Sequence, residues 1–236
     1  MTSKKKILGY LGILLLITGG MSSCDTQDAE TVTYTWTTDS GLKACDHILF
    51  TNGKEDVNGT DIGNGDQEFV FTGYQVLSKK TYNLKGWIYV ADSAVLAIDP
   101  GTIIKADKDS HAAIIVEQGG KIIAQGNDSL PIVFTSNQEK GSRKPGDWGG
   151  IILCGKAPNN QGTIQLKGGP RSKHGGSKST DNSGTLSYVR IEYAGYPNQT
   201  SNDFNGLTLA SVGSGTTLDH IQISYSNDDS YHEQKT

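Results

Sequence analysis

The chain has 236 residues and a formal net charge of −4, from 21 lysines and arginines against 25 aspartates and glutamates. Its 30 glycines make up about 13% of the chain, which is nearly double the usual share of about 7%. With charged residues at 19%, the composition excludes a coiled coil and an acidic disordered tail. Three cysteines are too few for a disulfide scaffold. Because no basic block exists beyond Lys4–Lys6, we expect no nucleic-acid partner.

The segment 1–23 has the pattern of a secretory signal peptide. Lys4–Lys6 precede an apolar run at 7–17, which is too short for a membrane core that needs about 20 residues. The sequence Met-Ser-Ser-Cys at 21–24 then resembles the lipobox of bacterial lipoproteins, with methionine where leucine is usual. The resemblance implies cleavage before Cys24 and acylation of that residue, which would hold the chain on a membrane. The alternative is an ordinary signal peptide with an incidental cysteine.

Residues 24–40 are acidic and rich in threonine, which indicates a tether between the lipid and the folded part. Residues 25–30 resemble the acidic export signal of Bacteroidetes surface lipoproteins. We therefore expect a lipid-anchored outer-membrane protein exposed at the cell surface, with a periplasm-facing anchor as the alternative. Both locations are oxidising, so Cys45 and Cys154 can form a disulfide with each other. The alternative, which we favour, is that both remain free buried thiols.

Residues 41–80 have a mixed pattern, and we interpret them as an N-terminal cap region. From residue 81 to 230, short β-branched runs alternate with turns of glycine, asparagine, aspartate and serine, and no helical periodicity is present. The spacing of equivalent runs is nearly constant. Three pairs, 26, 26 and 29 residues apart, show it: Ile88 and Ile114, Leu96 and Ile122, and Ile103 and Ile132.

A second self-match aligns residues 186–193 with residues 218–225 at an offset of 32. At equivalent positions both segments have a leucine, then a valine or isoleucine, then an isoleucine and then a tyrosine. Polar residues lie between these positions, as in strands with one buried face. Repeats of 26–32 residues with three short strands each predict a solenoid of β-coils, roughly five or six of them. A β-sandwich explains the spacing of the strands but not the two self-matches.

Six short motifs follow one another in this region. They are LKGWIYV at 84–90, DPGTIIK at 99–105, PIVFTS at 131–136, GDWGGII at 146–152, DNSGTL at 181–186, and NGLTL at 205–209 with VGSGTT at 212–217. In this order they resemble the secreted and lipid-anchored right-handed β-helix proteins of Bacteroidetes, whose function is unassigned. The resemblance implies an all-β, right-handed parallel β-helix, and it supplies no catalytic residue, because none is established for that family. Because that family continues with further coils, we interpret residues 231–236 as an uncapped tail and expect a truncated chain.

Residues 56–61 place side-chain oxygens at alternate positions, as calcium loops do. Asp61 stands where such a loop has glycine, however, and Gln67 stands where it has glutamate. A solvated turn explains the segment better, so we expect no cofactor, with Ca²⁺ here as the alternative. The five histidines lack the spacing of a zinc site, so no metal site is expected.

Polar residues on the last repeat form the candidate ligand face. Arg190 and Gln222 are equivalent in the second self-match and are expected to point outward, on the same face as Glu192. Asp228 and Asp229 follow close behind. Glycan hydrolases with a β-helix fold use clustered aspartates, and inversion needs two carboxyl groups roughly 6.5–9.5 Å apart. Lyases of this fold use calcium-binding aspartates with a lysine or arginine base.

We therefore expect a monomeric, surface-anchored module that binds glycans or a partner surface, or serves a structural role, without catalysis. Aromatic side chains are either platforms for sugar rings or, as we favour for Tyr193 and Tyr225, a stack between coils. The first alternative function is a polysaccharide lyase or glycoside hydrolase of the β-helix type. The second is a truncated fragment without independent function.

Overall fold

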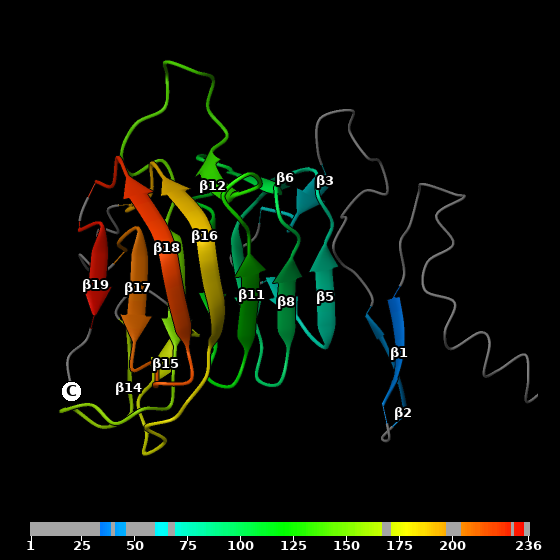
Figure 1. The fold of residues 1–236 in the computed structure, drawn as a ribbon, viewed down its shortest axis with the longest axis vertical. Helices are drawn as coiled ribbons and strands as arrows, with labels where there is room; N and C mark the ends of the chain where they lie inside the picture. Colours follow the sequence, from blue (N-terminus) through cyan, green and yellow to red (C-terminus); the bar gives the residue numbers. More distant parts are fainter. Residues whose placement is uncertain are drawn as a thin grey trace, which may run out of the picture.

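The computed structural model describes residues 34–38, 41–45, 60–65, 69–166, 171–196, 204–227 and 229–233. Every regular element among them is a β-strand (Figure 1). The segment 1–33, with Cys24, and the residue Asp228 lie outside the described residues. Within the described part, no helix has the length and apolar character needed to cross a membrane.

Strands β1 (Tyr34–Thr38) and β2 (Gly41–Cys45) form an antiparallel hairpin, which occupies segments predicted as tether and cap. The first face of the coils consists of β3 (Thr60–Ile62), β6 (Thr81–Leu84), β9 (Ile103–Ala106), β12 (Ile132–Ser136) and the second halves of β16 (Gly184–Glu192) and β18 (Thr217–Ser224). The second face consists of β4 (Phe69–Phe71), β7 (Trp87–Val90), β10 (Ala113–Val116), β13 (Gly150–Cys154), β17 (Leu207–Ala210) and β19 (Tyr231–Glu233). The third face consists of β5 (Tyr74–Leu77), β8 (Val95–Ile98), β11 (Lys121–Gln125) and the first halves of β16 and β18.

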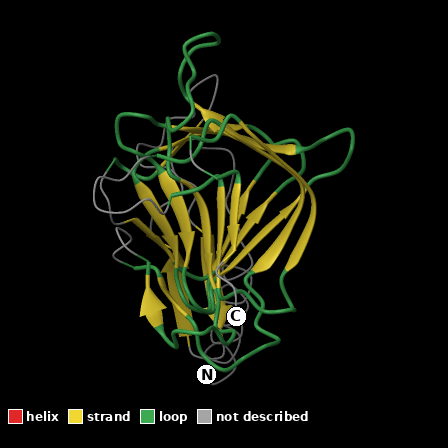
Figure 2. Ribbon diagram, turned by 90° about the vertical axis from the view of Figure 1, so that its left-hand side faces the viewer, coloured by secondary structure: helices red, strands yellow, loops and turns green. Residues whose placement is uncertain are grey.

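All pairs between successive coils are parallel, and three strands wind once around the core. Figure 1 shows the third face as β5, β8, β11, β16 and β18 side by side, and Figure 2 shows the sheets curled around a common interior with loops at both ends. The chain is therefore a right-handed parallel β-helix, as predicted. A first coil, β3–β5, already lies within residues 41–80, ahead of the predicted coil segment.

The predicted register is confirmed at three places and wrong at one. Ile88 pairs with Ile114 and Leu96 with Ile122, as expected, and β16 pairs with β18 in the register of the second self-match. On the first face, however, Ile103 pairs with Val133 rather than with Ile132, so the register is shifted by one position. The reason is that Ile103 is an outward residue, 38% exposed, and the buried pair is Ile104 with Phe134.

The core is a continuous column of inward side chains from successive coils. On the first and third faces, buried and more exposed positions alternate along β5, β6, β8, β9 and β11. Each buried isoleucine or leucine contributes roughly 1.5–3 kcal/mol by leaving water. The second face differs, because β7, β10, β13 and β17 are buried on both sides. A second apolar cluster, with Leu166 of the segment between β13 and β16, covers its outer side.

One cysteine can be placed in this interior. Cys154, on β13, is a free and fully buried thiol. Burial and the nearby charge of Glu117 raise the pKa of the Cys154 thiol far above its usual range. The prediction of a free buried thiol is thus confirmed for Cys154, whereas the side chain of Cys45 lies outside the described residues.

Candidate ligand-binding face

The last two described coils carry the candidate ligand face on the outside of β16 and β18. Parallel pairing sets Arg190 beside Gln222 and Glu192 beside Ser224. Their neighbours Val189 and Ile191 are fully buried, so strand alternation turns Arg190 and Glu192 outward. The expected equivalence and outward direction of Arg190 and Gln222 are confirmed.

Glu192 is held at the centre of this face by groups from two coils. Arg190 Nη2 lies 2.5 Å from Glu192 Oε1, and Thr135 Oγ1 of β12 donates a hydrogen bond of 3.0 Å to Glu192 Oε2. The side chain of Glu192 is 12% exposed and that of Arg190 is 45% exposed. Both carboxylate oxygens are therefore engaged, while the guanidinium still faces solvent.

Arg143 reaches the same place from the loop between β12 and β13. Its Nη1 donates to Thr135 Oγ1 at 3.3 Å, and its Nε donates to the carbonyl oxygen of Gln138 at 2.9 Å. Its guanidinium carbon lies 6.0 Å from the ring centroid of Tyr193. Sequence reasoning missed Arg143, because no spacing along the chain connects residue 143 with residue 193.

Two aromatic stacks border the face. Tyr193 stacks on Tyr225 with ring centroids 4.9 Å apart, which confirms the predicted stack between coils. Tyr188 stacks on His220 with centroids 4.2 Å apart, at the bend within β16 and β18. All four residues have positive φ, between 48° and 62°, a conformation that bulky side chains rarely adopt. The second stack was not predicted, although the second self-match also aligns Tyr188 with His220.

The acidic residues at 226–230 do not join this arrangement in the described part of the chain. Asp229 is exposed, and its backbone carbonyl accepts a hydrogen bond from Ser226 Oγ at 3.1 Å. No ion pair or hydrogen bond of the described residues links its carboxylate to Arg190 or Glu192. Asp228 lies outside the described residues.

Nothing in the described residues forms a cluster of three or more histidine, cysteine, aspartate or glutamate side chains suited to a metal. Most of the loop at 56–61 lies outside them. Asp61, its last residue, accepts from Asn83 Nδ2 at 3.1 Å and lies 2.5 Å from Lys85 Nζ. This carboxylate therefore already has a cationic partner. The expectation of no cofactor, with Ca²⁺ at the loop as the alternative, stays a prediction.

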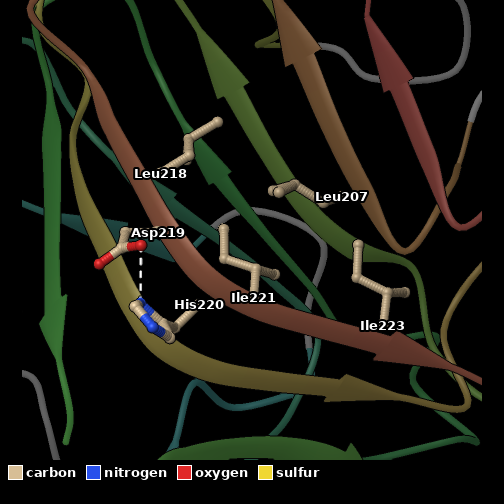
Figure 3. A pocket seen from close by; sticks show the side chains of 6 residues that line it. All are labelled: Leu207, Leu218, Asp219, His220, Ile221 and Ile223. Atoms are coloured by element: carbon tan, nitrogen blue, oxygen red, sulfur yellow. Dashed lines mark ion pairs between the residues drawn. The ribbon is translucent and has the colours of Figure 1, made fainter.

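A pocket of about 350 Å³ lies on the inner side of β18 (Figure 3). Leu207, Leu218, Ile221 and Ile223 give it an apolar lining, whereas Asp219 Oδ1 and His220 Nδ1 lie 2.7 Å apart at its edge. Leu218 is 36% exposed, but its partner one coil earlier, Leu186, is fully buried. The pocket is therefore the end of the apolar core and offers few polar groups to a ligand.

Comparison with known proteins identifies the family of the coils. The family model described as a pectate-lyase-like β-helix domain matches residues 71–232, which is more than half of the chain. No curated protein and no solved structure matches the sequence. The matched segment runs from β4 to β19 and so includes both strands of the candidate ligand face. The chain therefore belongs to the family of pectate-lyase-like β-helix domains.

Proposed function

We propose that this protein is a binding module, without catalysis of its own, whose ligand is a glycan held on the outer side of β16 and β18. The observation that carries the proposal is the combination of an exposed guanidinium, amide and hydroxyl ladder with an exposed aromatic stack. Arg190, Gln222 and Ser224 supply the ladder, and Tyr225, at 64% exposure, supplies the ring. Sugar hydroxyls accept and donate hydrogen bonds, and sugar rings pack on aromatic side chains.

The state of Glu192 favours binding over catalysis. A general acid or base must be able to exchange a proton with the substrate, but both oxygens of Glu192 are occupied by Arg190 and Thr135. The ion pair also orients Arg190, whose planar fork of donors suits paired oxygens on a ligand. An oriented guanidinium of this kind supports the proposal that the face holds a ligand.

The test is a binding titration of the purified chain with a panel of polysaccharides, followed by single substitutions. Arg190→Ala and Gln222→Ala are expected to weaken binding of any ligand found by about tenfold, because each removes one or two hydrogen bonds worth roughly 1–1.5 kcal/mol. Lys121→Ala, which removes a positive charge on β11 of the third face, is the matched control and should leave affinity unchanged. Equal loss in all three variants would contradict the proposed face.

The membrane anchor is the second part of the proposal, and the sequence around Cys24 supports it. Acylation at Cys24 would place the β-helix at the surface of the outer membrane, with residues 25–40 as spacer. Intact mass of the protein from membranes should show a lipid-modified N-terminal cysteine, and Cys24→Ala should release the chain into the soluble fraction. An unmodified N-terminus, or membrane retention of Cys24→Ala, would contradict the anchor.

A further inference from the structure

The segment between β13 and β16 lies across the outer side of the second face, and we call its described residues, 155–166 and 171–183, the strap. The strap contains the short antiparallel pair β14 (Ile164–Gln165) and β15 (Lys173–His174). Leu166 of the strap packs in one apolar cluster with outward residues of the second face. These include Tyr89, Ile115, Ile152 and Cys154. The strap, together with Phe204 of the segment before β17, therefore covers an apolar strip that lies outside the inward core of the coils.

Polar contacts at both ends of β15 fasten the strap. Arg171 forms an ion pair with Glu117 of the turn after β10, and its guanidinium lies 5.2 Å from the ring centroid of Tyr89. Gln118 donates from Nε2 to the carbonyl oxygens of Gly155 and Gly175 at 2.9 and 2.8 Å. These contacts tie the strap to the turn that joins β10 and β11.

The third fastening is a buried histidine. His174 Nδ1 lies 2.9 Å from Ser211 Oγ, just after β17, and Asn159 Nδ2 donates to the same oxygen at 2.8 Å. His174 is fully buried, and within the described residues its Nε2 has no hydrogen-bond partner. Because Asn159 already donates to Ser211 Oγ, that hydroxyl can direct its own proton to a neutral His174.

Among the described residues, no hydrogen bond or ion pair gives an imidazolium at His174 a counter-charge. The turn at 211–216, β14 and the loop at 157–163 contain no ionisable side chain. The groups on the other neighbouring segments are Glu117, Cys154, Lys156, Arg171, Lys173, Lys178 and Asp181. Of the two carboxylates, Glu117 is paired with Arg171, and Asp181 has a buried oxygen without a hydrogen-bond partner. Among the described residues, no hydrogen bond or ion pair joins either of them to His174.

We propose that the strap is an acid-released cover: protonation of His174 detaches it from the second face and exposes the apolar strip beneath. Charging His174 would place a positive charge and a second donor, Nε2–H, in a buried site where the described residues offer Nε2 no hydrogen-bond acceptor. Burying an unpaired charge in this way is unfavourable. Opening the strap brings the imidazolium into water. The coils remain folded, because their inward core does not include the strap.

The direction of the pH effect follows from proton linkage. Burial lowers the pKa of His174 below its ordinary value of 6.5. The open strap therefore binds a proton more readily than the closed strap as the pH falls below 6.5. The ratio of open to closed strap then rises by up to about tenfold per pH unit, until the pKa of the closed form is passed. Above pH 6.5 the ratio no longer changes with the protonation of His174.

Cys154 reports this opening, because it is fully buried beneath the strap. The experiment measures the rate at which 4,4′-dithiodipyridine labels Cys154 in the full chain between pH 4.5 and 8, with the site assigned by peptide mass spectrometry. Each rate is divided by the rate for the denatured chain at the same pH, which removes the reactivity of the thiol itself. We expect the quotient to be flat above pH 6.5 and to rise below it, with β-sheet circular dichroism unchanged.

Three variants test whether the protonation of His174 causes the rise in the labelling quotient. His174→Gln should abolish the rise, whereas His220→Gln, a histidine exposed on β18, should keep it. Glu117→Gln should also keep it, which separates His174 from the ion pair of Arg171. A flat quotient in the unaltered protein, a rise that survives His174→Gln, or a loss of circular dichroism over the same pH range would overturn the proposal. If His174→Gln does not fold, loss of the rise in Glu117→Gln overturns it instead.

Discussion

Tyr193 and Tyr225 lie on successive coils with their ring centroids 4.9 Å apart and their planes 5° apart. Neighbouring strands of a sheet are about 4.7–4.9 Å apart, so the two rings are spaced by the coils that carry them. Both residues have positive φ, 62° and 57°. At the border of the proposed ligand face, the favourable contact between the rings therefore offsets part of the free-energy cost of the positive φ angles.

Removing the outer ring of this stack should destabilise the last coils slightly. Tyr225→Ala removes the aromatic contact, which is worth roughly 0.5–1.5 kcal/mol beyond area burial. The free energy of unfolding, measured with urea, should fall by about this amount. Tyr225→Phe keeps the ring and is the control, with no expected change. If both variants lost the same stability, the hydroxyl rather than the stack would be responsible.

The register of the first face can be tested by two substitutions that differ in burial. Phe134 is fully buried in the core, so Phe134→Ala should cost roughly 3–5 kcal/mol of unfolding free energy. Ile103, at 38% exposure, should tolerate alanine within about 0.5 kcal/mol. A large loss for Ile103→Ala would contradict the pairing of Ile103 with Val133 and support its pairing with Ile132.

Gly184 marks the point where the chain returns to the third face after the strap. Its φ is 118°, and a Cβ there would lie 1.8 Å from the carbonyl oxygen of Ile122. Gly141 has a similar φ of 95°, but a Cβ added there would meet no atom within 4 Å. Thermal unfolding should show a modest loss for Gly141→Ala, about 1–2 kcal/mol from the backbone alone. For Gly184→Ala we expect roughly 3–5 kcal/mol, and equal losses would contradict the close approach.

Asp147 should make stability depend on pH in the acid range. Its burial alone would raise its pKa, but hydrogen bonds from Ser136 and the Lys144 N–H, together with Lys108, lower the pKa below the ordinary value of 3.8. A lowered carboxyl pKa contributes stability that is fully present above the unfolded value and is lost as the pH falls through the folded one. Asp147→Asn should therefore be less stable than the unaltered protein at pH 7.

The difference in the free energy of unfolding between Asp147→Asn and the unaltered protein should then become smaller as the pH is lowered below the ordinary carboxyl pKa of 3.8. Urea unfolding at several pH values between 2.5 and 7 measures it. Asp109→Asn is the control, since Asp109 is exposed and makes no ion pair among the described residues, and it should leave the pH profile unchanged. A gap that stays constant down to pH 2.5 would contradict the lowered pKa of Asp147.

The parts of the fold that repeat were predictable from sequence, because stacked coils place equivalent residues in contact. The second self-match predicted the pairing of Leu186 with Leu218 and the stack of Tyr193 on Tyr225. The register at Ile103 was missed because a β-branched residue on an outward position has the same pattern as an inward one. Burial, which sequence does not show, separates the two.

The parts of the site that come from irregular segments were not predictable. Arg143 and His174 belong to insertions of irregular length between coils, so no period relates them to Tyr193 or Ser211. Their contacts depend on how each insertion folds back onto a sheet face. The polar ladder of Arg190 and Gln222, in contrast, followed directly from strand alternation.

Binding without catalysis can be tested by one incubation with two readouts. The full chain is incubated with each polysaccharide of a panel, and retention of the protein on the glycan and the chain length of that glycan are measured together. We expect retention on at least one polysaccharide, with no shortening and no new reducing or unsaturated ends. Shortening of a retained polysaccharide, or no retention on any of them, would contradict it.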